Sequence, residues 1–235
     1  MYAMDMVGSG RNLTYALLDT VGKAIVTGQY DASAFPTEAD LAKQFAVSRS
    51  VTREAVKMLT AKGLLVARPR KGTSVQPARA WNLFDPDVLR WMLERKFSPD
   101  LLRQFNELRI AIEPMAAALA ASGSSAAGIA AIEAGYERMV AAEAGGDDPL
   151  EADIAFHIAV LEASANPFYG QFRDVVKTAL RTSIRFTNRF KGRTANLPQH
   201  RAVLTAIEAR DPQAAEQAMR TLIVDVMALI AEARA

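Results

Sequence analysis

Apolar residues near the start of the chain recur with the period of a helix. They are spaced four apart, at Leu13, Leu17, Val21 and Ile25. This spacing predicts an amphipathic helix over residues 12–27, ending near Gly28.

Capping residues mark two shorter helices after it. Thr37 is a suitable N-cap for the first, and Asp40 stands at its third position, as in a capping box. Ser48 caps the second, which we expect to reach about Lys62, where Gly63 can adopt the left-handed conformation that follows a helix.

The period then changes to that of short strands. LLVA (64–67) and TSVQ (73–76) flank RPRKG (68–72), a basic segment typical of a hairpin tip. Three helices followed by a hairpin predict an N-terminal winged helix-turn-helix, whose recognition helix enters the major groove of DNA.

The helix after Ser48 has one basic face and one apolar face. Arg49, Arg53 and Lys57 are spaced four apart, and Arg can bind guanine O6 and N7 with two hydrogen bonds. Residues 41–75 contain eight basic residues and one acidic residue, a charge typical of a surface for a polyanion. The alternative is an ordinary solvated helix and hairpin.

Every segment after residue 78 is predicted to be helical. Residues 79–98 form a connector with a short helix starting at Asp85-Pro86, and residues 99–235 form an antiparallel all-α helical bundle. The predicted fold is therefore mainly α, with a DNA-binding domain over residues 1–78. The bundle helices are expected from Pro99 with Pro114 inside, and over 125–144, 149–164, 166–191, 199–209 and 212–233.

Ionisable residues in the bundle suggest a ligand site. Asp153 and His157 lie four apart on one helix face, and His200 can approach from another helix to hold a divalent metal. A local hydrogen bond between Asp153 and His157 is the simpler alternative. Arg109 is predicted either to meet the carboxylate of a ligand or to pair with Glu113 one turn later.

Basic residues also recur along the fourth bundle helix, at Arg173, Lys177, Arg181, Arg185, Arg189 and, beyond its expected end, Arg193. Positions four apart drift by about 40° per step around a helix. The series can therefore bind an anion, as we expect for Arg181, contact nucleic acid, or form a solvated face.

Composition excludes some classes of protein. The 235 residues include no cysteine, which excludes disulfides and thiolate metal sites. No apolar run reaches the roughly 20 residues of a membrane span, and the first residues lack the pattern of a signal peptide. We expect a cytoplasmic protein with no membrane partner.

Residues 35–75 closely resemble the DNA-binding domain of GntR-family transcriptional regulators. The C-terminal part resembles the all-helical FCD effector domain of the FadR subgroup, in ELRIAIEP (107–114), Asp153 with Phe156-His157, and HRAVLTAIEARD (200–211). WNLFDPDVLRWMLE (81–94) and EADIAFH (151–157) are similar to regulators of sugar-acid catabolism.

The resemblance implies a set of site residues. Asp153, His157 and His200 match three of four metal-binding positions, for one divalent Zn, Mn or Ni ion per subunit, while the fourth is Leu222. Another departure is Ala39, where the family often has arginine. The expected effector-binding residues are Arg109, Asp153, His157, Arg181 and His200. The expected DNA-binding residues are Thr37, Glu38, Ser48, Arg49, Ser50, Thr52, Arg53, Lys57, Arg68, Arg70, Lys71 and Gly72.

These features predict a homodimeric regulator, a repressor of a sugar-acid catabolic operon. It would leave a palindromic double-stranded DNA operator when a small acidic effector such as D-galactonate binds. Two alternatives stay open at this point. One is a metal-dependent hydrolase domain fused to a DNA-binding module, and the other is an architectural DNA-binding protein with no ligand.

Overall fold

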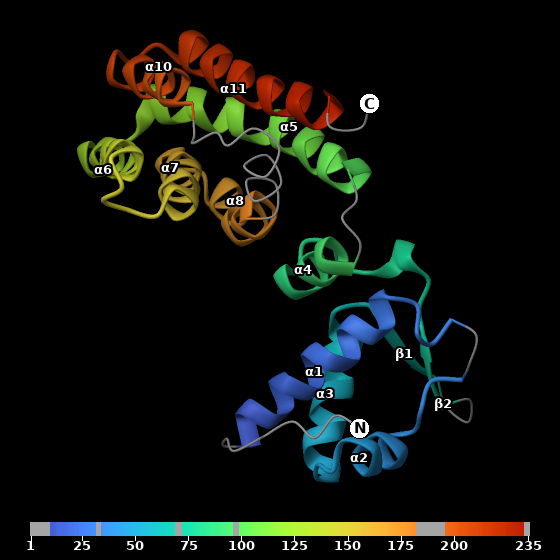
Figure 1. Cartoon of the computed structure of the whole chain (residues 1–235). Coiled ribbons are helices and arrows are strands. Elements are labelled where there is room, and N and C mark those ends of the chain that lie inside the picture. The colour runs from blue at the N-terminus through green and yellow to red at the C-terminus, as the bar shows by residue number, and fades with distance from the viewer. Residues whose placement is uncertain (1–9, 32–33, 69–71, 96–98, 182–195, 233–235) are drawn as a thin grey trace. The chain divides into compact units, whose positions relative to one another are not determined.

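The computed structural model describes residues 10–31, 34–68, 72–95, 99–181 and 196–232. The chain divides into two compact units, Met1–Lys96 and Phe97–Ala235 (Figure 1). Within the described residues the structure is mainly helical, with one two-stranded sheet. None of the helices in that part of the chain is both long and apolar enough to cross a membrane.

The first unit is a winged helix-turn-helix followed by a further helix. The strands of the wing pair antiparallel, from Leu65 opposite Val75 to Arg68 opposite Gly72. The elements are α1 (Gly10–Val26), α2 (Glu38–Phe45), α3 (Arg49–Ala61), β1 (Leu65–Arg68), β2 (Gly72–Val75), a 3-10 turn (Ala78–Ala80) and α4 (Pro86–Arg95).

The predicted caps of α2 and α3 are confirmed. The Thr37 hydroxyl accepts from the Asp40 amide at 3.2 Å, and the Asp40 carboxylate accepts from the Thr37 amide at 3.1 Å, which completes a capping box. Ser48 accepts from the Val51 amide at 3.3 Å. Gly63 has φ +78°, the left-handed conformation expected after α3.

Helix α4 is packed into the first unit through Trp91. This side chain is fully buried, and its indole Nε1 donates to Asp19 Oδ1 of α1 at 2.7 Å. The ring lies directly over Gly22, where an added Cβ would come within 2.3 Å of it. The aromatic ring therefore fills the space that the missing side chain leaves.

An ion-pair network also holds α4 to the end of α3. Lys62 Nζ, just after α3, donates to both carboxylate oxygens of Asp85 at 2.8 and 2.7 Å, and to Asp87 at 2.8 Å. Asp85 Oδ1 in turn accepts from the amides of Asp87 and Val88, so it caps α4 as predicted. The expected connector, as far as Lys96, thus belongs to the first unit.

The second unit is the predicted antiparallel helical bundle. Helix α5 packs along α11, α6 packs along α7, and α10 contacts α5, α6 and α11 (Figure 1). Small side chains of α5, among them Ala117 and Ala120, are fully buried. The elements are α5 (Pro99–Gly123), α6 (Ala126–Glu143), α7 (Pro149–Ala163), α8 (Pro167–Gly170), α10 (Leu197–Glu208) and α11 (Pro212–Glu232).

The fourth bundle helix differs from the prediction of one helix over 166–191. It is interrupted after α8, and the chain is helical again over residues 173–181. Gln171 and Phe172 donate to carbonyls three residues earlier, which forms a tight turn in place of the α-helical pattern. Gly170 at this break has low helix propensity.

Several predictions fall outside the described residues. These are the wing-tip contacts Arg70 and Lys71, and the end of the fourth bundle helix with Arg185, Arg189 and Arg193.

We expect Gly22→Ala to destabilise the first unit. In an exposed helix this change stabilises by about 1 kcal/mol, but the new Cβ would lie 2.3 Å from Trp91, and such overpacking costs about 1–3 kcal/mol. Calorimetric unfolding of the full chain measures the effect. The control is Gly123→Ala at the end of α5, where nothing lies within 4 Å of the added Cβ. A Gly22→Ala melting temperature equal to or above wild type would contradict the account.

Candidate functional site

The basic face of α3 is exposed, as the sequence predicts. Arg49, Arg53 and Lys57 are exposed, whereas Ala55 and Leu59 on the other side are buried in the core of the first unit. Lys57 is only loosely engaged, because its nearest acidic partner is 3.6 Å away and both side chains are more than half exposed. These cations are therefore available for phosphates and guanines.

Polar groups surround this basic face. Ser48 and Ser50 are exposed at the start of α3, with their hydroxyl oxygens 2.9 Å apart, and Thr37 and Glu38 are exposed at the start of α2. A helix start with exposed hydroxyls suits a backbone phosphate.

The base of the wing is also exposed. Arg68 ends β1 and pairs in register with Gly72, which begins β2. Gly72 has φ +77°, a conformation that favours glycine at the return of the hairpin.

Thr52 corrects the predicted set of DNA contacts. Its side chain is fully buried, and its hydroxyl donates to the Ser48 carbonyl at 3.3 Å. Helical periodicity explains the difference, because residue 52 lies between the buried positions 56 and 59 around the helix and not beside 53 and 57. Thr52 therefore packs beneath the recognition surface.

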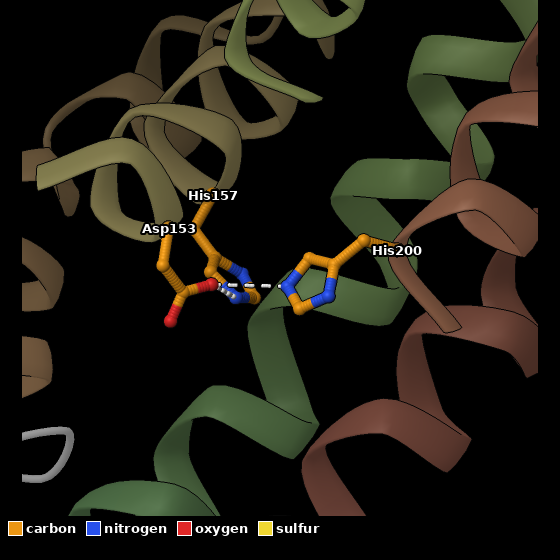
Figure 2. A group of neighbouring side chains, drawn as sticks. All are labelled: Asp153, His157 and His200. Carbon is orange, nitrogen blue, oxygen red and sulfur yellow. Dashed lines mark ion pairs between the residues drawn. The ribbon is translucent and has the colours of Figure 1, made fainter. Parts of the chain in front are cut away.

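The second candidate site is a buried cluster in the bundle. Asp153 and His157 project from α7 and His200 projects from α10, so that the three side chains converge (Figure 2). One ligand atom from each lies within 4.8 Å of the others. Asp153 Oδ1 is 3.0 Å from His200 Nε2 and 3.5 Å from His157 Nε2. The three residues that the sequence predicts as a cluster therefore lie together.

Both histidines are oriented by a hydrogen bond from Nδ1. His200 Nδ1 lies 2.8 Å from the Asn196 carbonyl, and His157 Nδ1 lies 2.6 Å from Glu113 Oε2. Carbonyl and carboxylate oxygens only accept, so each Nδ1 carries the proton. In the neutral rings, Nε2 then has the lone pair, and both Nε2 atoms face Asp153.

Two buried atoms of this cluster lack a hydrogen bond. Asp153 Oδ1 and His200 Nε2 are close, but their geometry does not form one. A carboxylate oxygen facing an imidazole lone pair in a buried site is unfavourable unless a positive charge lies between them. One oxygen and two imidazole nitrogens also suit Zn, Mn or Ni. The residues present therefore fit a divalent metal.

A buried ion pair supports the cluster from α5. Arg109 Nε and Nη2 donate to the two oxygens of Glu113 at 2.5 and 3.2 Å, and Nη1 donates to Asn106 Oδ1 at 3.1 Å. Of the two interpretations of Arg109, the structure shows the Glu113 pair. Arg109 Nη2 also lies within hydrogen-bonding distance of His157, 3.3 Å from Nε2 and 3.4 Å from Nδ1.

Electrostatic coupling keeps the carboxylates of this site ionised. Burial alone would raise the pKa of Glu113, but the charge of Arg109 and the hydrogen bonds from Arg109 and His157 lower it from 4.5 to about 2. Burial also opposes ionisation of Asp153, and contact with His200 outweighs it, so that the Asp153 pKa is lowered. The cluster therefore contains two carboxylates in their charged form.

Arg181 and Leu222, the remaining positions considered for the effector and the metal, do not belong to this cluster. Arg181 donates from Nε and Nη2 to Glu151 Oε1 at 3.0 and 2.7 Å, an ion pair that is roughly 40% exposed on each side. The structure thus pairs Arg181 with Glu151, and an effector contact stays a prediction. Leu222 is buried on α11 and offers no ligand atom.

Sequence reasoning missed the link between Glu113 and His157. These residues are 44 positions apart, and no local spacing connects them. It also missed the Asn196 carbonyl that orients His200, because backbone acceptors leave no signal in residue identity.

The chain matches two known domain families. Residues 16–75 match the bacterial regulatory proteins of the gntR family, and residues 104–225 match the FCD domain. The chain therefore belongs to the GntR family of transcriptional regulators, with an FCD domain after its DNA-binding domain. The relatives are regulators and not enzymes, so the hydrolase alternative is wrong.

Relatives of known name cover nearly the whole chain. The galactonate operon transcriptional repressor of Escherichia coli is 37% identical, over 90% of this chain and 94% of its own. The HTH-type regulator YieP of the same organism is 34% identical, over 93% and 96%.

Solved structures agree with this fold. The Streptococcus agalactiae GntR structure, 25% identical, has a TM-score of 0.50 and covers 92% of this chain and 99% of its own. The structure of Lar from Listeria monocytogenes has a TM-score of 0.64 at 14% identity, covering 98% and 99%, and supports the fold alone.

We expect Glu113→Gln to make the free energy of unfolding less dependent on pH at acidic pH. A carboxyl group whose folded pKa is lowered stabilises the fold above its unfolded pKa, near 4.5. That contribution is lost as the pH falls towards 2, and it is on the order of 3 kcal/mol. The variant also leaves Arg109 buried without an anion, so it should be less stable at neutral pH.

Calorimetry of the full chain between pH 2 and 7 measures both effects. Glu107→Gln is the control, because Glu107 pairs with Arg103 on the same helix but is half exposed, where such pairs contribute little. If stability depends on pH in the same way in wild type and Glu113→Gln, then Glu113 does not stabilise the fold in its charged form.

Proposed function

We propose that this chain is the repressor of a sugar-acid catabolic operon, released from its operator by a small acidic effector such as D-galactonate. The observation that carries the effector part is the buried cluster of Asp153, His157 and His200 with its two unpartnered atoms. The similarity to the galactonate operon repressor supports the choice of acid and of repression. A regulator of this kind acts in the cytoplasm.

For the DNA part, the exposed basic face of α3 enters the major groove. Arg49 and Arg53 contact base edges and Lys57 contacts phosphate, while Arg68 and the wing tip reach the adjacent backbone. A palindromic operator mirrors twofold protein symmetry, so we propose that the chain binds as a homodimer.

For the effector part, the bundle supplies a site that favours an acid. Asp153, His157 and His200 would hold one Zn, Mn or Ni ion, which supplies positive charge and open coordination positions for carboxylate and hydroxyl oxygens. Since Arg109 is already paired with Glu113, its guanidinium does not supply that charge. Leu222 adds no fourth protein ligand, which leaves more positions for the effector.

Effector binding then has to weaken operator binding. A coupling free energy of about 1–3 kcal/mol changes affinity 5- to 150-fold, which is enough to shift operator occupancy. The coupling is reciprocal, so operator DNA should weaken effector binding by the same factor. Absence of any effect of metabolites on DNA binding would favour the architectural alternative.

We expect Arg49→Ala and Arg53→Ala each to weaken specific operator binding by about 1–3 kcal/mol through loss of a base contact. Lys57→Ala should instead weaken binding to all DNA sequences similarly. It should also reduce the slope of log affinity against log salt concentration by about one unit. Fluorescence anisotropy on the operator at several salt concentrations measures this. Titration at saturating concentrations should give two chains per operator.

The control for these variants is Arg79→Ala. Arg79 is an exposed cation of the same unit that lies outside α2, α3 and the wing. Wild-type affinity in both the Arg49 and Arg53 variants would refute the recognition surface, and one chain per operator would refute the dimer.

We expect metal and acid to bind the bundle in a linked manner. D-galactonate should bind the metal-loaded chain at least tenfold more tightly than the chelator-treated chain, and His157→Ala should abolish that difference. Elemental analysis and calorimetric titration measure both. Glu162→Gln, an exposed change on the same helix α7, is the control. If chelation and His157→Ala change nothing, the acid binds without a metal.

A further inference from the structure

Glu113 joins two buried groups that no local sequence signal connects. Its Oε2 accepts from His157 Nδ1 at 2.6 Å, and its two oxygens together accept from Arg109 Nε and Nη2. Its side chain is 1% exposed, so water cannot replace either partner. Both contacts therefore have to be made by the protein itself.

We propose that Glu113 is a positioning residue of the effector site, which fixes the Nδ1–H tautomer of His157 so that Nε2 faces Asp153. This inference rests on the proposed metal site, because its purpose is to present Nε2 as a ligand atom. A carboxylate that accepts from the second nitrogen of a ligating histidine orients the ring and strengthens the ligand.

The arrangement around His200 supports this role. His200 Nδ1 donates to a backbone carbonyl, Asn196 O, and its Nε2 faces the same Asp153 oxygen. Two histidines from different helices thus have the same tautomer and converge on one atom. A histidine buried only for packing has no need to match a second one in this way.

Arg109 and Asn106 hold Glu113 in place. Arg109 engages both Glu113 oxygens, and Asn106 accepts from Arg109 Nη1 at 3.1 Å while donating to the Leu102 carbonyl at 2.8 Å. All of these groups lie on α5. Contacts within this one helix therefore hold the Glu113 carboxylate that His157 of α7 contacts. The rival account is that Glu113 only neutralises Arg109 and that its contact with His157 has no consequence.

Imidazole tautomers separate these two accounts. The chain has only two histidines, so long-range ¹⁵N–¹H spectra of the metal-free full-length protein at alkaline pH contain two imidazole patterns. His200→Gln leaves one pattern and assigns both. We expect wild-type His157 and His200 both to be Nδ1–H tautomers.

The test variant is Arg109→Met with Glu113→Leu. Removing both charges together avoids a buried unpaired ion, a change that folded proteins often tolerate. We expect His157 to lose the pure Nδ1–H pattern and His200 to keep it. Glu113→Gln retains an acceptor oxygen and should restore the Nδ1–H pattern of His157 at least in part.

The chain offers a matched control on the same helix. Arg103 and Glu107 are also an arginine and a glutamate four apart on α5, but their paired side chains are 42% and 50% exposed. Arg103→Met with Glu107→Leu should leave both histidine patterns unchanged. An unchanged His157 pattern in the Arg109/Glu113 variant, or an Nε2–H tautomer in wild type, would overturn the inference.

Metal titration gives the second readout. Calorimetry with Zn²⁺ or Mn²⁺ should show roughly 10- to 100-fold weaker binding in the Arg109/Glu113 variant and no change in the Arg103/Glu107 control. Equal affinity in the test variant and wild type would also overturn the inference. If wild type binds neither ion, the proposed metal site fails and so does the purpose assigned to Glu113, whereas the spectra still decide whether Glu113 fixes the tautomer.

Discussion

The ion pair between Arg109 and Glu113 determines how the interior of the bundle can hold charge. An isolated buried ion is strongly unfavourable, and the pair persists because each partner satisfies the other. Asn106 accepts from Arg109 and His157 donates to Glu113, so each ion of the pair has a further hydrogen-bond partner. Glu113 of this pair orients His157 through Nδ1, and the Nε2 atom of the same ring then faces Asp153.

The first unit keeps its charged residues at the surface and has an apolar core. Its core is apolar and its recognition face is polar, so α3 can expose Arg49 and Arg53 while Leu59 is fully buried. Lys62, directly after α3, is bound to Asp85 and Asp87 at the start of α4. These short ionic contacts tie the start of α4 to the end of α3. The same unit thus joins the DNA-binding surface to the last helix before the effector-binding unit.

Local rules account for what the sequence could predict. The caps at Thr37 and Ser48, the turn at Gly63 and the shared face of Asp153 and His157 all depend on residues within four positions of each other. Predictions failed where a neighbour in space decides the outcome. Thr52 is among the expected DNA contacts, but its place around the helix buries it. The break after α8 arises from a turn that apolar periodicity does not reveal.

The formal charges of the cluster support the proposed combination of a bound cation and an acidic effector. If both histidines are counted as neutral metal ligands, the charges of Arg109 and Glu113 cancel and Asp153 leaves one negative charge in a buried site. That charge repels an acid, and the low dielectric of the interior makes the repulsion stronger than in water. A divalent cation changes the sum from −1 to +1, which one carboxylate neutralises. In the proposed site, Glu113 cancels the charge of Arg109, so attraction of a monocarboxylate would depend on the ion held by Asp153 and the two Nε2 atoms.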